Sequence, residues 1–309
     1  MISTFFIIAA YFYLMLFPSL SFAQENPDKT LYQKNSLYQY IAVINDTQKR
    51  ERYIIGNKRK TKELIQGGIY IDKPEKLLFE YTQMSFVGLA FLDREPQKVL
   101  FVGLGAGSMP RYFNRYYPNV QIDIVEIDPD IYYVAKKYFH FQAKDNMKTY
   151  IADGRVFIKR AQKKYDMIFL DAYQGDYIPF HLATVEFLQE VKDILKDDGI
   201  VIANIRSPYK NKLFYSMIKT YKEVFPSLYI FKGQKSRNYI FITAEHTVKK
   251  DEKTISGRAK KIQTSKKFDI DLLRICRSFA YYTEYEREAK VLTDDFAPVN
   301  LYRYMKVDN

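Results

Sequence analysis

The sequence predicts an α/β protein with a doubly wound, mostly parallel seven-stranded sheet, helices on both faces, and a small β-hairpin domain in front of it. Three observations predict this fold. Short apolar runs recur through the middle of the chain, amphipathic stretches of helical spacing separate them, and a glycine triplet follows the first run. Strands that alternate with helices are typical of right-handed βαβ units. We therefore expect a Rossmann-like sheet.

The first 23 residues have the pattern of an export signal. They carry no charged side chain, and Phe5–Phe17 is almost purely apolar before Pro18 interrupts the run. Ser21-Phe22-Ala23 then supplies small residues at the two positions that a signal peptidase reads. The apolar run is shorter than the roughly 20 residues of a membrane span. We expect residues 1–23 to be a cleaved signal peptide and the product to be periplasmic or secreted. An uncleaved N-terminal membrane anchor is the alternative.

Residues 24–92 predict a β-rich N-terminal domain that ends in a linking helix. The stretch from Gln24 to about Asn35 is polar, so we expect it to be frayed. Between Leu37 and Tyr70 short β-rich pieces alternate with Gly and Asn turns, a pattern that favours hairpins over helices. Lys76–Leu92 has apolar residues at helical spacing and predicts a helix.

Residues 93–247 predict the main domain. Lys98–Gly103 is a short apolar run that ends in a glycine, as expected of a buried parallel strand. Similar runs predict strands at Ile122–Val125, Thr149–Ala152, Met167–Leu170, Ile200–Asn204 and Tyr239–Thr243. The stretches between them predict helices at Pro129–Tyr138, Leu182–Leu195 and Lys212–Val224.

Residues 248–309 predict a basic loop, a C-terminal helix and a tail. Val248–Lys267 is basic and contains Ser, Thr and Gly, so we expect a mobile surface loop. Phe268–Glu286 predicts a helix, in which Cys276 is a small buried residue.

Composition excludes several classes of function. The net charge of +12 favours anionic partners, but the charges are spread out and no zinc-knuckle or RNA-binding signature accompanies them. We therefore expect no nucleic-acid partner. One cysteine and three histidines exclude an internal disulfide framework and argue against a metal site.

The glycine triplet predicts a nucleotide-binding turn. Gly103, Gly105 and Gly107 follow the first strand of the main domain and open a helix. Glu126 ends the second strand about 20 residues later, where nucleotide-binding folds place an acid that accepts the ribose hydroxyls. The alternative is that Glu126 only caps the Asp128-Pro129-Asp130 turn.

The spacing of the glycines favours an adenosine ligand over a dinucleotide. A dinucleotide site usually has Gly-x-Gly-x-x-Gly, whereas this loop has Gly-x-Gly-x-Gly. Asp153 and Gly154 end the third strand, where an acid in sites for S-adenosylmethionine (AdoMet) meets the adenine amino group. Successive strand ends are where open α/β sheets bind ligands.

Taken together, these residues resemble a divergent branch of the spermidine synthase (polyamine aminopropyltransferase) family, within the class I AdoMet-dependent methyltransferase-like superfamily. The resemblance covers roughly residues 37–224 and part of the tail. The motifs that carry it are Tyr38-Gln39, Phe79–Met84, the glycine loop, Val125–Asp128, Asp153-Gly154, Tyr165–Asp171 and Leu292–Pro298.

The resemblance implies a role for each candidate residue. Gln39 and Tyr81 would line the amine-substrate side, Glu126 would hold the ribose and Asp153 the adenine, and Asp171 would be the catalytic carboxylate. An acid suits that last role, because a carboxylate can hold an ammonium ion and then accept its proton as the amine attacks. The alternative is an aspartate that caps the next turn. Family members commonly pair, so a homodimer is implied as well.

Two positions depart from the family pattern. The family's glycine loop carries an acid that holds the aminopropyl ammonium of decarboxylated AdoMet, and here that position is Ala106. The family also has a second acid three residues after the catalytic one, where this chain has Gln174. Asp176 is a candidate substitute on the amine-substrate side.

Three hypotheses follow. The first is an aminopropyltransferase-like enzyme that uses decarboxylated AdoMet and a small-molecule amine. The second, favoured by Ala106, is a methyltransferase that uses AdoMet. The third is an inactive, exported protein that binds a polyamine or nucleoside, or that docks weakly to anionic membrane surfaces through its basic loops. His181, just after the expected active-site loop, either contacts substrate or caps the following helix.

Overall fold

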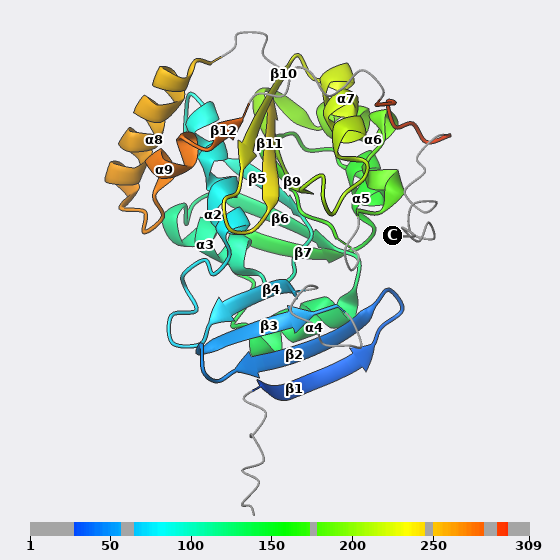
Figure 1. The fold of residues 1–309 in the computed structure, drawn as a ribbon, viewed down its shortest axis with the longest axis vertical. Coiled ribbons are helices and arrows are strands. Elements are labelled where there is room, and N and C mark those ends of the chain that lie inside the picture. Colours follow the sequence, from blue (N-terminus) through cyan, green and yellow to red (C-terminus); the bar gives the residue numbers. More distant parts are fainter. Residues whose placement is uncertain (1–27, 57–64, 174–177, 245–249, 281–288, 296–309) are drawn as a thin grey trace, which may run out of the picture.

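The computed structural model describes residues 28–56, 65–173, 178–244, 250–280 and 289–295, and they form two sheets (Figure 1). The N-terminal sheet is antiparallel with strand order β1-β2-β3-β4. Its strands are β1 (Asp28–Asn35), β2 (Tyr40–Asp46), β3 (Glu51–Ile55) and β4 (Ile65–Tyr70). The predicted hairpins are therefore present. The expected signal at residues 1–23 and part of the β3–β4 connection lie outside the described residues.

The expectation of a frayed segment before residue 35 is wrong for β1. Residues 28–35 pair with β2 in antiparallel register from Asp28 opposite Asp46 to Asn35 opposite Tyr40. Leu31 and Tyr32 pack against a small core formed by β2, β3, β4 and α4 (Pro129–Tyr138). This mostly polar segment is therefore a strand because its backbone hydrogen-bonds to β2 and two apolar side chains pack against the core.

The main sheet has the order β12-β10-β11-β9-β8-β5-β6-β7. From β9 to β7 all neighbours are parallel, whereas β11 is antiparallel to β9 and β10, and β10 is antiparallel to β12. The strands are β5 (Lys98–Val102), β6 (Gln121–Glu126), β7 (Met147–Ile151), β8 (Tyr165–Leu170), β9 (Leu195–Arg206), β10 (Ser227–Lys232), β11 (Asn238–Ala244) and β12 (Phe279–Ala280). Six of these strands lie at the predicted runs, whereas no run was assigned to β10, which brings the number to the expected seven, and two-residue β12 adds an edge.

Helices cover both faces of this sheet, as predicted. One face packs against α3 (Ser108–Tyr116), a 3₁₀ helix (Phe86–Phe91), α8 (Glu252–Lys266) and α9 (Leu272–Cys276). The other packs against α5 (Gly154–Arg160), α6 (Val185–Asp193) and α7 (Phe214–Val224). Figure 1 shows these two groups on opposite sides of the sheet. The inner parallel strands β5, β6 and β8 are therefore largely buried on both faces, whereas β7 at the edge of the sheet is only partly buried.

The helix predicted at Lys76–Leu92 is shorter than expected. α2 spans only Glu80–Ser85 and continues as the 3₁₀ helix, whose six residues are all buried. A segment enclosed on every side loses the one-sided pattern that marks a regular surface helix.

The basic segment after residue 248 is also different from the expected loop. Residues 252–266 form α8. The Asp251 side chain caps its first turn by accepting the Thr254 amide, and the side chains of Ile255 and Ala259 pack into the core. Conversely, the helix expected at Phe268–Glu286 is reduced to α9, and the chain then pairs with β10 as β12. Cys276 is buried at the end of α9, as predicted. Residues 281–288 lie outside the described part. None of the described helices is long and apolar enough to span a membrane.

We predict that Gly107→Ala lowers the free energy of unfolding by about 2 kcal/mol. Gly107 precedes α3 with φ +67°, and an added Cβ would lie 2.5 Å from the Phe141 ring. Gly257→Ala is the matched control: Gly257 lies inside α8 with nothing within 4 Å of its added Cβ. That change should stabilise the protein by about 0.5–1 kcal/mol. Urea unfolding of both variants measures the two effects. Equal destabilisation would contradict the claim that position 107 requires a glycine.

Candidate active site

A cavity of about 420 Å³ opens at the carboxyl ends of β5, β6, β8 and β9 and beneath the N-terminal sheet. β5 lies between β6 and β8, and such a reversal of strand order is where doubly wound sheets bind ligands. Eight residues predicted from the sequence line it: Gln39, Tyr81, Gly103, Gly105, Glu126, Asp153, Gly154 and Asp171. Gly107 is not among the lining residues and acts in the turn before α3. Asp176 and Gln174 lie outside the described residues.

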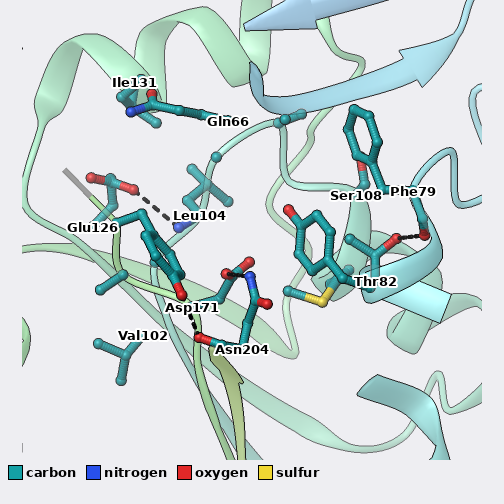
Figure 2. Close-up of a pocket in the computed structure, with 18 of the residues that line it drawn as sticks. Gln66, Phe79, Thr82, Val102, Leu104, Ser108, Glu126, Ile131, Asp171 and Asn204 are labelled. Carbon is teal, nitrogen blue, oxygen red and sulfur yellow. Dashed lines mark hydrogen bonds between the residues drawn. The ribbon is translucent and has the colours of Figure 1, made fainter. Parts of the chain in front are cut away.

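The glycine loop and Glu126 form one end of the cavity. Glu126 Oε2 accepts a hydrogen bond of 3.0 Å from the Leu104 amide, and Oε1 accepts one of 3.0 Å from the Asp128 amide. Figure 2 shows the first of these bonds at the edge of the cavity. Burial raises the pKa of Glu126, and hydrogen bonds from the amides of Asp128, Leu104 and Gly105 partly offset that effect. Asp128 caps α4, and Glu126 in turn accepts the Asp128 amide, so the structure leaves both the turn-capping and the ligand-binding interpretation of Glu126 open.

Asp153 stands beside Glu126 at the end of the next strand. Its Oδ1 accepts a hydrogen bond from the Val156 amide and so caps α5, while Oδ2 lies 2.9 Å from His181 Nε2. His181 also lines the cavity. The hypothesis that His181 caps the following helix is wrong, because Thr184 performs that function for α6.

Asp171 occupies the floor of the cavity immediately after β8. Its Oδ1 accepts a 2.8 Å hydrogen bond from Asn204 Nδ2 (Figure 2). The carboxylate faces the cavity but is otherwise enclosed by protein, and this desolvation raises its pKa to about 7. The Asn204 bond and the charge of Arg206 act in the opposite direction. The carboxyl group therefore changes protonation near neutral pH, where a general base is most effective.

Close packing fixes Asp171 against the glycine loop. Gly103 has φ +102°, and a Cβ at this position would lie 2.3 Å from the Asp171 carbonyl oxygen. The Asp171 amide also donates to the Val102 carbonyl. The catalytic candidate and the loop that faces the nucleoside end are therefore joined by direct backbone contact.

Tyrosines surround the carboxyl group. Burial, and then the charge of Asp171, raise the pKa of Tyr81 well above its usual value, and the same two causes raise that of Tyr173. Both hydroxyls therefore stay protonated. Gln39 lies farther out, where its Oε1 accepts a 2.6 Å hydrogen bond from Gln66 Nε2.

The structure adds residues that the sequence did not single out. Tyr173 donates to the Asn204 carbonyl and accepts from the Arg206 amide, and the Arg206 guanidinium lies 5.5 Å from the centre of the Tyr173 ring. Asn204 and Arg206 lie at the end of β9. The sequence could have indicated Asn204 as a site residue, because it ends a predicted strand. Lys210 and Arg237 also line this side of the cavity, and no sequence motif marks either.

A turn between β10 and β11 forms the rim on the same side, and Glu80 holds it. The Glu80 carboxylate accepts hydrogen bonds from the amides of Gln234, Lys235 and Ser236, two of them 2.7 Å long. Burial alone would raise the pKa of Glu80, but these amides outweigh it and lower the pKa. The rim is therefore anchored to α2, which also carries Tyr81.

Ala106 is buried, with an exposure of 3%. It faces Gly67 of β4, where an added Cβ would come within 2.9 Å of the Ala106 amide nitrogen. This position offers a methyl group, not a carboxylate, to a ligand in the cavity. Among the described residues no group of three His, Cys, Asp or Glu side chains is arranged to hold a metal ion.

Known proteins are similar to this chain in both sequence and fold. Residues 78–252 match the spermine/spermidine synthase domain. The polyamine aminopropyltransferase of Vibrio vulnificus (strain CMCP6) is 35% identical over 279 residues, which are 88% of this chain and 91% of that protein. Human methyltransferase-like protein 13, solved in complex with SAH, is 29% identical with a TM-score of 0.53, covering 68% of this chain and 98% of that one.

A third similarity concerns the fold alone. A probable spermidine synthase from Corynebacterium glutamicum ATCC 13032 is 20% identical and covers 85% of this chain and 96% of its own, with a TM-score of 0.64. The matched domain and the Vibrio relative extend over the glycine loop, both strand-end acids and Asp171. By sequence and by fold, this chain belongs to the spermine/spermidine synthase family.

Proposed function

We propose that this protein is an aminopropyltransferase, which moves the aminopropyl group of decarboxylated AdoMet to a primary amine. One observation carries the proposal. A single cavity joins a nucleoside-type end, formed by the glycine loop with Glu126 and Asp153, to a carboxyl group whose pKa is about 7. The name of the Vibrio relative supports the same activity.

The nucleoside end has suitable groups for an adenosine. The Glu126 carboxylate accepts the amides of Leu104, Asp128 and Gly105 and has further lone pairs for a ribose hydroxyl. Asp153 is held by the α5 amide and by His181, so its carboxylate is fixed where an adenine amino group can donate to it. The glycines let the backbone approach the ligand closely.

Asp171 supplies the proton chemistry. The amine nitrogen forms a bond to the propyl carbon beside the sulfonium, the carbon–sulfur bond breaks, and its electron pair stays on sulfur to give neutral methylthioadenosine. Ionised Asp171 attracts the incoming ammonium and takes one proton from it, so that a nitrogen lone pair is available. Asn204 fixes one carboxylate oxygen, which leaves the other to face the amine.

The direct test is product formation. Purified protein is incubated with decarboxylated AdoMet and a panel of primary amines, and methylthioadenosine and the aminopropylated amine are quantified by chromatography and mass spectrometry. We expect both products in equal amounts. Absence of methylthioadenosine with every amine, from protein that binds the nucleoside, would overturn the proposal.

Methyl transfer from AdoMet is the second candidate, and Ala106 is the observation that favours it. A buried methyl group at this position neither holds an aminopropyl ammonium nor repels the carboxylate that AdoMet carries. The likeness to methyltransferase-like protein 13 with bound SAH supports this candidate.

Ala106→Asp separates the two donors. We expect the ratio of the AdoMet to the decarboxylated AdoMet dissociation constant to rise at least tenfold, about 1.4 kcal/mol, because the new carboxylate attracts the ammonium and repels the donor carboxylate. Ala106→Asn is the neutral control of equal size. Isothermal titration calorimetry measures both constants. An unchanged ratio in the Asp variant would show that the donor's aminopropyl end lies elsewhere.

Export and assembly are further proposals. The apolar run at residues 5–17 and the small residues before Gln24 support a cleaved signal and a periplasmic or secreted product. Mass spectrometry of the mature protein tests this: a chain that retains residue 1 would favour the membrane-anchor alternative. We retain the homodimer as a proposal by resemblance, and light scattering tests it.

A further inference from the structure

Three cations line the amine side of the cavity and have no role in the step described above. They are Arg206 at the end of β9, Lys210 in the following turn, and Arg237 immediately before β11. Arg206 is half-buried, whereas Lys210 and Arg237 are exposed at the mouth. In the part of the chain that the structure describes, none of the three takes part in an ion pair with a carboxylate.

Backbone contacts bring the three cations to one rim. The Ser207 amide donates to the Arg237 carbonyl at 3.0 Å, and the Lys210 amide donates to the Ser207 carbonyl at 2.9 Å. In the β9–β11 register, Asn238 lies opposite Arg206. The positions are therefore fixed relative to one another by the sheet and its turns, with Glu80 holding the turn that leads to Arg237.

Arg237 occupies this rim at a conformational cost. Its φ is +55°, in the left-handed region that favours glycine over residues with a side chain. Strained residues of this kind concentrate at functional sites.

The described carboxylates near the rim are fewer than its three cations: Asp171 feels the charge of Arg206, and Glu80 is engaged by the three amides of the turn. Glu126 and Asp153 are at the nucleoside end and are engaged there, by backbone amides and by His181. Only Asp171 faces the amine side among the described lining residues. Among the described lining residues, a diamine would bring two positive charges to one carboxylate and three cations. Like charges in a partly desolvated site repel strongly.

Building on the proposed function, we infer that the acceptor is a small primary amine that also carries a carboxylate. Its amino group would lie at Asp171, and its carboxylate would be held by the rim of Arg206, Lys210 and Arg237. A guanidinium suits a carboxylate because it donates two parallel hydrogen bonds. The opposite ends of the acceptor then meet opposite charges.

The test compares acceptors of equal length that differ only in the second group. The pairs are 3-aminopropanoate and 1,3-diaminopropane, 4-aminobutyrate and putrescine, and 5-aminopentanoate and cadaverine. With decarboxylated AdoMet as donor, we expect kcat/KM for the best amino acid to exceed that of its matching diamine at least tenfold. A preference for the diamine in every pair would overturn the inference and leave the aminopropyltransferase proposal standing.

Charge reversal at the rim tests the residues themselves. Arg237→Glu should lower the amino-acid-to-diamine ratio of kcat/KM at least tenfold. The ratio is insensitive to any loss of total activity that both acceptors share. Lys235→Glu is the matched control, because Lys235 is an exposed cation of the same turn whose side chain does not line the cavity; it should change the ratio less than threefold. Equal effects of the two variants would overturn the assignment.

A binding experiment separates failure of this inference from failure of the proposed function. If neither acceptor series yields methylthioadenosine, aminopropyl transfer is wrong, and calorimetry on protein saturated with methylthioadenosine then decides the acceptor class. Tighter binding of 4-aminobutyrate than of putrescine, weakened by Arg237→Glu, supports the inference. Equal affinities, or no binding, overturn it. A loss confined to AdoMet affinity in Arg237→Glu would also overturn it, because the rim would then hold the donor carboxylate.

Discussion

Asp171→Asn is expected to lower kcat about 1,000-fold, the contribution of a well-placed general base. The amide keeps the size of the side chain but can neither attract the ammonium nor accept its proton. In the unchanged enzyme kcat/KM should rise with pH and level off above about 7, because ionised Asp171 is the active form and its pKa is about 7. Initial rates from pH 5 to 9 measure both effects, and the acid limb should disappear in the variant.

The same substitution should stabilise the fold at alkaline pH. The folded-state pKa of Asp171 is above the ordinary value of about 3.9, so the folded protein binds this proton more tightly than the unfolded chain. Stability is therefore lost as pH rises from about 4 to about 7, and the full penalty persists above that. Since the carboxylate is partly open to the cavity, we expect Asp171→Asn to gain about 2 kcal/mol at pH 8 and little at pH 4.

The opposite responses of activity and stability distinguish an active-site role from a structural one. Asp145→Asn, at an exposed position, serves as the control and should change neither property. A variant at position 171 that keeps at least a tenth of the activity would remove Asp171 from the mechanism. One that is less stable at pH 8 would show that the carboxylate makes a structural contact.

Arg155→Met is expected to lower the free energy of unfolding by about 3 kcal/mol. The Arg155 side chain is only 10% exposed and makes paired hydrogen bonds of 2.7–2.8 Å to Glu190 and 2.7 Å to Asp294. It also donates to the His181 carbonyl. Removal of the guanidinium leaves Glu190 with the exposed Lys159, and Asp294 with the Thr184 hydroxyl, as the remaining side-chain partners. The expected loss lies at the low end for a buried ion pair because the Asp294 side chain is 42% exposed.

Lys159→Met is the matched control for this cluster. Lys159 also contacts Glu190, at 3.2 Å, but its side chain is 54% exposed. Exposed pairs contribute about 0–1 kcal/mol, so this variant should unfold near the unchanged protein. Urea unfolding at pH 7 compares them. If the free energy of unfolding fell no further in Arg155→Met than in Lys159→Met, the ion pairs of Arg155 would not contribute to stability.

The sequence was informative where local pattern decides structure. Apolar runs predicted six strands of the main sheet, five of them inside the sheet, because a strand buried on both faces needs apolar residues throughout. The ends of those runs located Glu126, Asp153 and Asp171, which the fold brings to one cavity. α4 could be predicted to the residue, since Pro129 and the capping Asp128 mark its start.

Tertiary contacts decided the rest, and no local pattern encodes them. α8 has a weak apolar face of few residues and a central glycine, so its helical state depends on packing of Ile255 and Ala259. Arg237 enters the cavity only because a hairpin that begins with β10 returns to β9. Glu80 belongs to a recognisable motif, yet its three bonds reach residues more than 150 positions away.

The pairing of Arg155 with Glu190 and Asp294 also constrains the order in which the protein can fold during synthesis. Arg155 and Asp294 are separated by 139 residues. At a synthesis rate of about 5–20 residues per second, the arginine is incorporated roughly 7 to 28 s before its second carboxylate exists. Throughout that interval the wall of the cavity next to His181 lacks one of its supports. Completion of the pocket is therefore a late event in biogenesis, and the nascent chain spends those seconds without its final shape.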